Sequence, residues 1–286
     1  MIQDIFPYKL NNQFVQNVLP SENDKVMIFD QGKVMVHLEA KSVTFPTVKN
    51  ASDSGIASDS LIYLFSISLE EGNKESYFLY QKTEVQIPGF EFTDLRPIRD
   101  TEIDFMYKVM AMMTAKHLSD WYRDTKFCGR CGCKTVHSKT ERAMVCSDEN
   151  CGYTMYPRIM PAVIVGVING DQILLTKYRK GYANNALIAG FTEIGETLEE
   201  TVAREVMEET GLKVKNIRYY KSQPWGLAND ILTGFYCDVD GDTKIRMDKN
   251  ELKEAAFVRR EDIILQPTKV SLTNEMMMRF KNGEEC

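Results

Sequence analysis

The residues best suited to chemistry are three glutamates in one short, highly charged segment. Glu205, Glu208 and Glu209 are spaced i, i+3 and i+4, so a helix would display their carboxylates on one face. Three like charges repel one another, and a bound divalent cation would remove that penalty. Oxygen-only ligands favour Mg²⁺ or Mn²⁺, which keep several waters and bind phosphate oxygens. The segment therefore predicts a metal-dependent site for a phosphate-containing substrate.

The neighbouring residues predict how this helix begins and ends. Thr197 with Glu200 fits a capping box, and Gly211 can end the helix in a left-handed conformation. The helix would therefore span 198–210. Its buried ridge would consist of Leu198, Val202 and Val206. The alternative is a solvated acidic helix, which is the usual meaning of a charge run. The agreement of the caps with the nearby glycines and arginine argues against that alternative.

Two further residue types would hold the carboxylates in position. Arg204 lies four residues before Glu208 and can bind carboxylates of the helix or of the preceding loop. Gly190 and Gly195 would let that loop bend, so that Glu196 reaches the same site. The predicted catalytic residues are Glu196, Arg204, Glu205, Glu208 and Glu209.

A second cluster consists of cysteines. Five of the seven lie between 128 and 151, in a chain without a secretion signal, which indicates metal binding rather than disulfides. The predicted zinc ligands are Cys128, Cys131, Cys146 and Cys151, which form two knuckles. Such a closed site is structural, because it leaves no position for water. Cys133 could compete as a ligand, since the second knuckle is long, and His137 is a more distant candidate. Free thiols without a metal are the alternative.

Composition narrows the function class. The 286 residues carry a net charge of −6 and a pI near 5.3, which argues against a general nucleic-acid binder. The cysteine-rich segment also shows no clustered Lys, Arg and aromatic residues, so nucleic-acid binding by it is disfavoured. No apolar run is long enough to cross a bilayer, and no secretion signal is present. The expected location is therefore the cytoplasm. Cys237 lies within an apolar run, so it is predicted to be a core residue.

Patterning divides the chain into three predicted domains. Residues 1–98 form a β-rich N-terminal domain, 99–156 a helix plus zinc ribbon, and 157–286 an α/β domain. The first domain contains no catalytic constellation, so we expect a scaffold or dimerisation role. Its predicted strands are 25–29, 33–38, 61–69 and 77–80, with a mobile loop at 50–60.

The other two predicted domains also carry recognisable elements. A helix over 101–122 would begin at a capping box of Thr101 with Asp104 and fill the core with the cluster Met110 to Met113. In the α/β domain, Asn169-Gly170-Asp171 marks a hairpin. The expected elements are strands 161–168 and 172–177, a glycine-rich loop, helix 198–210, strands 213–221 and 231–238, and helix 272–281.

The catalytic segment resembles the Nudix family. Residues 190–212 match the box G-x5-E-x7-R-E-U-x-E-E-x-G-U, where U is aliphatic, at every fixed position. The resemblance implies an α/β/α sandwich in which water attacks a phosphorus of a nucleoside diphosphate derivative. It also implies that Glu205 and Glu209 are the main metal ligands, with Glu208 a ligand or base. The metals would polarise the pyrophosphate and lower the pKa of the attacking water.

The order of the parts is similar to that of the zinc-ribbon NADH pyrophosphatases. The matching motifs include Phe127-Cys128-Gly129, Tyr156-Pro157-Arg158 and Ser222-Gln223-Pro224-Trp225. The resemblance implies a further metal ligand at Glu251 and nicotinamide stacking by Phe191 and Tyr156. The substrate-binding residues it suggests are Tyr156, Gly190, Phe191, Gln223 and Trp225. The chain departs from the family at 226–230, which weakens the assignment of substrate, and Trp225 with Pro224 could simply be packing residues.

The leading functional hypothesis is hydrolysis of NADH or NAD⁺ to nicotinamide mononucleotide and AMP. Removal of NAD caps from RNA 5′ ends is a secondary possibility that the resemblance adds. The alternatives are a Nudix hydrolase for ADP-ribose or diadenosine compounds, and a non-catalytic nucleotide sensor or zinc-ribbon adaptor. The resemblance also implies a homodimer, with Mg²⁺ or Mn²⁺ as catalytic and Zn²⁺ as structural cofactor.

Overall fold

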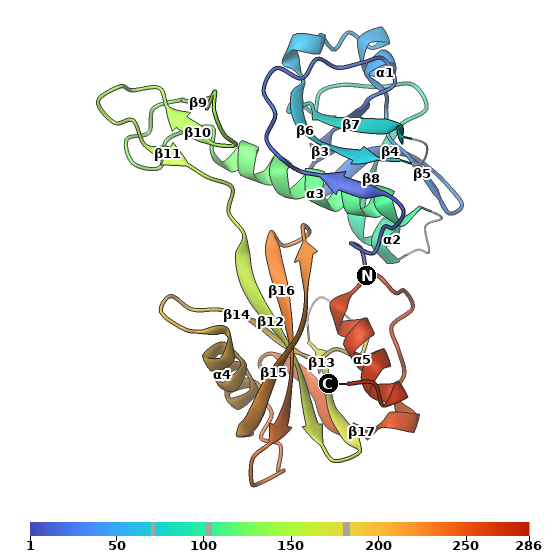
Figure 1. Cartoon of the computed structure of the whole chain (residues 1–286), viewed down its shortest axis with the longest axis vertical. Coiled ribbons are helices and arrows are strands. Elements are labelled where there is room, and N and C mark those ends of the chain that lie inside the picture. Colours follow the sequence, from blue (N-terminus) through green and yellow to red (C-terminus); the bar gives the residue numbers. More distant parts are fainter. Residues whose placement is uncertain (70–71, 101–104, 180–183, 286) are drawn as a thin grey trace. The chain divides into compact units, whose positions relative to one another are not determined.

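The computed structural model describes residues 1–69, 72–100, 105–179 and 184–285, and they form two compact units (Figure 1). The first unit contains residues 1–2, 159–225 and 230–286, and the second contains 3–158 and 226–229. We call them the catalytic unit and the ribbon unit, after the clusters that each contains. The finer division of the chain into three domains stays a prediction. Within the described residues, no helix has both the length and the apolar character needed to cross a membrane.

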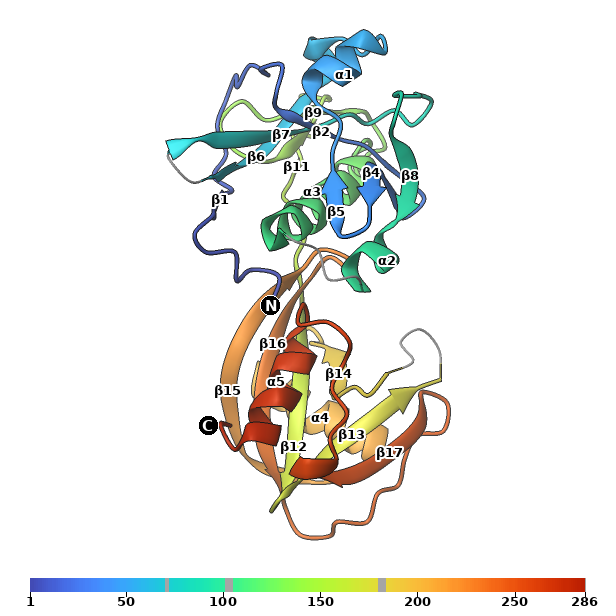
Figure 2. The ribbon, with the colours of Figure 1, turned by 90° about the vertical axis from the view of Figure 1, so that its right-hand side faces the viewer.

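The catalytic unit is a six-stranded sheet with a helix on each face (Figures 1 and 2). The strand order is β15-β16-β12-β13-β17, and β14 also pairs with β12. The elements are β12 (Met160–Asn169), β13 (Gln172–Tyr178), β14 (Ile188–Phe191), α4 (Leu198–Thr210), β15 (Val214–Trp225), β16 (Asp230–Val239), β17 (Leu252–Arg259) and α5 (Leu272–Asn282). The predicted α/β/α sandwich is therefore confirmed.

Alternating residues of β12 build the two cores of this unit. Val163, Val165 and Val167 face α4, whose Val202 and Val206 are fully buried. Ile164 and Ile168 point the other way and pack with Leu272, Met276 and Phe280 of α5. A period of two along a strand places successive side chains on opposite faces, so one strand serves both layers. Cys237 belongs to the α4 core, as predicted, and burial raises its pKa to about 12.

The ribbon unit contains two small sheets, a long helix and the cysteine-rich ribbon. One sheet has the order β1-β6-β7-β2; the other has β3-β4-β5, with β8 paired to β4. The elements are β1 (Lys9–Asn11), β2 (Lys25–Met27), β3 (Phe29–Asp30), β4 (Lys33–Glu39), β5 (Ser42–Thr44), α1 (Val48–Asp53), β6 (Ile62–Ser68), β7 (Lys74–Leu79), β8 (Glu91–Asp94), α2 (Leu95–Asp100), α3 (Met106–Asp124), β9 (Thr135–His137), β10 (Met144–Cys146) and β11 (Thr154–Met155). The predicted β-rich N-terminal region and zinc ribbon are both present.

Two local predictions differ from the structure. The segment 50–60 was expected to be a loop, but α1 covers its beginning and a 3-10 turn its end. Thr47 starts α1 through a reciprocal capping box with Asn50, which stabilises a helix of poor intrinsic propensity. The helix α3 begins after Phe105, and the predicted capping box of Thr101 with Asp104 lies outside the described residues. The Met110–Met113 cluster is buried, as expected of core residues.

Candidate active site and metal centres

Local sequence signals build α4 as predicted. The Thr197 side chain accepts a hydrogen bond from the Glu200 backbone N–H, and the Glu200 carboxylate accepts one from the Thr197 backbone N–H. Gly211 ends the helix at φ 69°, the left-handed conformation that costs glycine least. Because Val202 and Val206 bury one side of α4 against the sheet, the neighbouring positions hold Glu205 and Glu209 at the edge of that buried face.

Arg204 organises the carboxylates around itself. Its Nε lies 2.6 Å from Glu196 Oε1, and its Nη1 lies 2.8 Å from Glu205 Oε1 and 3.0 Å from Glu208 Oε2. Its Nη2 donates to the Phe191 carbonyl at 2.9 Å, which ties α4 to the end of β14. The sequence predicted that Arg204 would bind loop and helix carboxylates, but it gave no sign of the Phe191 carbonyl as a partner.

Glu196 reaches the site, and both of its carboxylate oxygens are paired with the Arg204 guanidinium. It also accepts hydrogen bonds from the Glu193 backbone N–H at 3.1 Å and from the Thr201 hydroxyl at 3.0 Å. The hydrogen bond from Arg204 is the main reason that its pKa falls to about 2. A carboxylate that holds protons so weakly is a poor general base. We therefore interpret Glu196 as a positioning residue for Arg204.

Glu209 is the least solvated carboxylate of the segment. It is 2% exposed, and its Oε2 atom has no hydrogen-bond partner among the described residues. Its Oε1 accepts a long hydrogen bond, 3.5 Å, from the Tyr178 hydroxyl, a contact that no sequence signal indicated. Burial, and then the charges of Glu251 and Glu205, raise the pKa of Glu209 to about 8. A buried, unpartnered carboxylate oxygen beside two further carboxylates fits a bound cation, which would satisfy it.

The carboxylates are near one another without forming a closed cage. Burial is also the largest cause of the raised pKa of Glu205, with Glu208 and Glu251 adding to it. Glu208 stays largely in solvent, with 60% of its side chain exposed. Within the described residues, three or more metal-ligand atoms gather within 4.8 Å only around thiols. Ligation of Mg²⁺ or Mn²⁺ by Glu205, Glu208, Glu209 and Glu251 therefore stays a prediction, in which the ion draws the carboxylates together.

Gly190 has a role other than the predicted one. It lies within β14 rather than in a flexible loop, and a Cβ built on it would be 1.9 Å from the carboxyl carbon of Glu205. Glycine is therefore needed because the Glu205 side chain lies against its backbone. Gly195, at φ 98°, does supply the expected left-handed bend of the loop.

We expect Gly190→Ala to lower metal-dependent turnover about 100-fold, because the new methyl group would displace Glu205, and loss of this predicted metal ligand would remove several kcal/mol of transition-state stabilisation. Steady-state kinetics and Mn²⁺ titration would measure the effect. In a Glu205→Ala background the same substitution should add little, since residues in contact are not additive. Full additivity of the two substitutions would contradict the steric explanation.

The predicted substrate-binding residues fall into two groups. The residues Phe191 and Tyr156 are 51% and 56% exposed, each within its own unit, and the Tyr156 hydroxyl donates to Glu141 at 3.0 Å. Gln223 is fully buried, and its amide donates to the Val270 carbonyl and accepts from the Leu272 N–H. Gln223 therefore anchors the start of α5, and this geometry gives no support for substrate contact. Trp225 is half-buried and packs against the α5 core.

The segment that departs from the family pattern packs against α3. A Cβ on Gly226 would be 2.0 Å from the Met113 carbonyl oxygen, so only glycine allows this approach. The Leu227 carbonyl accepts a hydrogen bond from Lys116 at 3.1 Å, and Asn229 adopts φ 64°. Asp230 is buried as the first residue of β16. Residues 226–229 are therefore held by specific contacts in the ribbon unit, whereas Asp230 belongs to the catalytic unit.

The four predicted zinc ligands converge. The Sγ atoms of Cys128, Cys131, Cys146 and Cys151 all lie within 4.8 Å of one another. The Cys128–Cys151 separation is 3.8 Å and the Cys131–Cys146 separation is 3.4 Å. Tetrahedral thiolate ligation requires this kind of arrangement. Cys133 instead groups with Cys131 and Asp148, and His137 belongs to neither group.

Two parts of the chain are similar to known protein domains. Residues 158–280 match the model of the NUDIX domain, and residues 123–156 match that of the NADH pyrophosphatase zinc ribbon domain.

The chain is 47% identical to the NAD-capped RNA hydrolase NudC of Citrobacter koseri over 153 residues, which is 52% of this chain. It is 46% identical to the protein of that name from Escherichia coli O1:K1 / APEC, again over 52% of this chain. The match spans only 58% of the length of each relative. Among solved structures, a NUDIX hydrolase from Nitrosomonas europaea aligns with a TM-score of 0.48 at 22% identity, covering 55% of this chain and 90% of that one.

Proposed function

Since the chain contains a Nudix domain and an NADH pyrophosphatase zinc ribbon domain, we propose that it hydrolyses the pyrophosphate bond of NADH or NAD⁺. The products would be nicotinamide mononucleotide, in its reduced or oxidised form, and AMP. The observation that carries the proposal is the buried carboxylate of Glu209, with one unpartnered oxygen beside the charges of Glu205 and Glu251. All glutamates of the box are present, which disfavours a non-catalytic sensor or adaptor.

The carboxylates that would hold Mg²⁺ or Mn²⁺ are Glu205, Glu208, Glu209 and Glu251. When bound, the cation would supply charge stabilisation at the phosphates and lower the pKa of a water. Arg204 fixes Glu205 and Glu208 by ion pairs and is itself held by Glu196. Glu208, the exposed carboxylate, is suited to orient the attacking water or to accept its proton.

Recognition of the base would use exposed rings. The half-exposed ring of Phe191 follows directly on Gly190 and its backbone carbonyl is fixed by Arg204, so its position is coupled to the carboxylate site. A planar nicotinamide can stack on such a ring at a gain of about 1 kcal/mol. Trp225 offers a half-buried ring in the same unit. Stacking by the exposed Tyr156, which belongs to the ribbon unit, stays a prediction.

A second candidate activity is removal of an NAD cap from RNA. The names of the two relatives favour it, because both are NAD-capped RNA hydrolases. The same bond and the same carboxylates would serve both substrates. Nudix hydrolysis of ADP-ribose or diadenosine compounds is the third candidate, since the segment 226–230 departs from the family signature.

A substrate panel tests these candidates. NADH, NAD⁺, ADP-ribose, a diadenosine polyphosphate and a 5′-NAD-capped RNA would be incubated with Mg²⁺ or Mn²⁺, with and without EDTA. We expect NADH turnover that EDTA abolishes, with AMP and reduced nicotinamide mononucleotide identified by mass spectrometry. Absence of turnover of every compound with either metal would refute the proposal, and preferential cleavage of ADP-ribose would favour the third candidate. Homodimerisation, which light scattering can measure, and a cytoplasmic location stay predictions.

A further inference from the structure

A pocket of about 330 Å³ lies where the end of α3 meets the zinc ribbon. Its lining includes Gln81, Tyr122, Lys126, Phe127, Lys134 and His137, all within the ribbon unit. None of the residues described as lining it is acidic, although the whole chain carries a net charge of −6. The pocket is therefore a local cationic site on an acidic protein, the kind of feature that attracts an anionic ligand.

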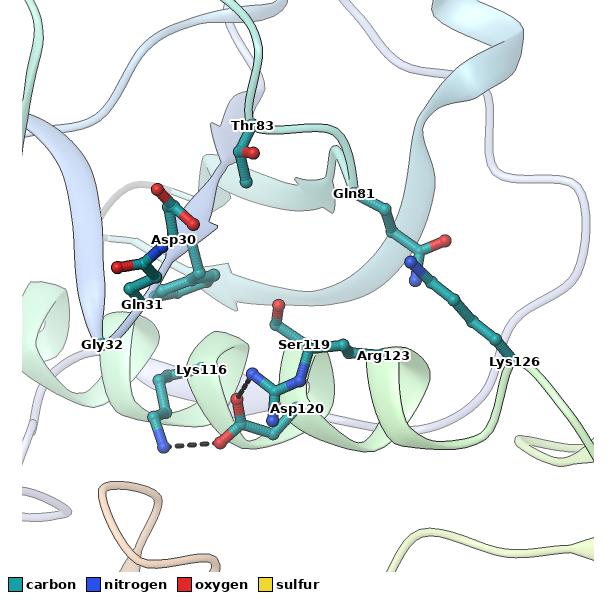
Figure 3. A pocket seen from close by; sticks show the side chains of 11 residues that line it. Asp30, Gln31, Gly32, Gln81, Thr83, Lys116, Ser119, Asp120, Arg123 and Lys126 are labelled. Atoms are coloured by element: carbon teal, nitrogen blue, oxygen red, sulfur yellow. Dashed lines mark hydrogen bonds and ion pairs between the residues drawn. The ribbon is translucent and has the colours of Figure 1, made fainter. Parts of the chain in front are cut away.

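The two lysines of this pocket are free to bind a ligand. Among the described residues, the ammonium groups of Lys126 and Lys134 have neither a hydrogen bond nor an ion pair. An adjoining pocket shares Gln81 and Lys126 with this one. Its other two cations are neutralised, because Arg123 and Lys116 form ion pairs with Asp120 at 2.8 and 2.5 Å (Figure 3). The unneutralised charge is therefore concentrated at Lys126 and Lys134.

Aromatic rings accompany these charges. Phe127 is 59% exposed and forms an antiparallel β-bridge with Lys134, so an apolar ring and an ammonium group are carried by directly opposed residues. His137 contributes a second exposed ring, and its centroid lies 5.3 Å from that of the buried Tyr122 ring. Free cations beside exposed rings are the combination that binds single-stranded nucleic acid, because phosphates meet the cations and bases stack on the rings.

The zinc knuckle sets the spacing of this pair. The Cys128 N–H donates to the Cys133 carbonyl at 2.7 Å, and the Gly132 N–H donates to the Cys128 carbonyl at 2.8 Å. These bonds close the turn between Phe127 and Lys134. The Thr135 N–H donates to the Lys126 carbonyl at 3.2 Å, which continues the pairing by one more residue. The aromatic and cationic side chains are therefore positioned by the backbone around the four thiols.

From this arrangement we infer that the pocket binds the single-stranded body of an RNA substrate, with Lys126 and Lys134 on its phosphates and a base stacked on Phe127. The inference rests on the proposed activity on capped RNA and adds a contact surface outside the carboxylate site. A free dinucleotide has no RNA body to reach this surface. The ribbon pocket would therefore raise turnover of capped RNA and leave turnover of free NADH unchanged.

Binding of an uncapped RNA tests the surface separately from catalysis. A fluorescein-labelled single-stranded RNA with a 5′-monophosphate would be titrated in an anisotropy assay at several salt concentrations. For the double variant Lys126→Ala with Lys134→Ala, we expect about tenfold weaker RNA binding. The slope of log affinity against log salt concentration should become shallower by about 1.4, which is about 0.7 for each lost charge. For Phe127→Ala we expect about tenfold weaker binding, which Phe127→Trp restores.

Lys139→Ala is the matched control, because Lys139 is an exposed ribbon lysine outside the pocket. It should bind RNA as the original chain does, and every variant should retain its zinc and its NADH turnover. The kcat/KM for capped RNA should fall by the same factor as RNA affinity. Unchanged RNA binding in the double variant, or an equal loss in Lys139→Ala, would overturn the inference. So would a Phe127→Ala variant that changes oligomeric state but not RNA affinity. The failure of the proposed hydrolysis would look different. If the original chain cleaved no dinucleotide but bound RNA, and the double lysine variant lost that binding, the proposed hydrolysis would be refuted while the assignment of this RNA-binding surface would stand.

Discussion

Replacing Glu209 with glutamine should lower kcat/KM for the preferred dinucleotide about 1000-fold. Its carboxylate is the buried member of the acidic group, and its unpartnered oxygen is the atom best placed to gain from a cation. Loss of an anionic ligand removes several kcal/mol of transition-state charge stabilisation, and each 1.36 kcal/mol changes the rate tenfold. Steady-state kinetics at saturating Mg²⁺ would measure the loss.

A thermal readout separates this role from a structural one. Burial disfavours the charged form of Glu209, so a neutral amide of the same shape should leave the Tm of the metal-free protein unchanged or higher. Mg²⁺ or Mn²⁺ should raise the Tm of the original chain but not that of Glu209→Gln. Glu199→Gln is the matched control, because Glu199 lies exposed on the first turn of the same helix. Full activity in Glu209→Gln would contradict its assignment as a metal ligand.

Local signals explain why α4 was predictable in full. Thr197, Glu200 and Gly211 specify its ends through contacts within a few residues, and the valine ridge specifies its buried side. The segment that forms β14 was expected to lie in a glycine-rich loop, because Ala189 and Gly190 in its middle are weak strand formers. It is a strand because Ile188 to Phe191 pair with Val165 to Ala162 of β12, and such long-range pairing leaves no mark on the segment itself.

The cationic pocket shows a second limit of reading along the chain. The sequence disfavoured nucleic-acid binding because the net charge is −6 and the cysteine-rich segment shows no clustered Lys, Arg and aromatic residues. Along the chain, Lys126 and Phe127 lie at least seven positions before Lys134 and His137. The zinc knuckle folds the intervening residues into a turn and opposes Phe127 to Lys134. A net charge of −6 also hides a local excess of the opposite sign. Linear clustering is thus a poor guide to surface charge wherever a metal site reverses the chain.

The second large effect is expected at the zinc site. Substituting Cys146→Ser should reduce bound zinc from about one ion per chain to nearly none, because a closed tetrahedral site needs all four thiolates. The ribbon strands β9, β10 and β11 are only two or three residues long, so they cannot bury enough apolar surface to stay folded alone. Structural zinc contributes about 10–16 kcal/mol to folding in zinc-finger peptides at neutral pH. We therefore expect trypsin to cleave the variant rapidly after Lys126, Arg130 or Lys134.

Cys133→Ser is the matched substitution, because Cys133 lies in the same turn but outside the group of four. It should keep about one zinc ion per chain and its resistance to trypsin. Cys146→Ser should also lose binding of uncapped RNA, since the turn that opposes Phe127 to Lys134 would be disordered. The hydrogen bonds between Arg204 and the carboxylates are internal to the catalytic unit, so they should survive in the variant. If Cys133→Ser lost zinc while Cys146→Ser kept it, the ligand set would have to be redrawn around Cys131, Cys133 and Asp148.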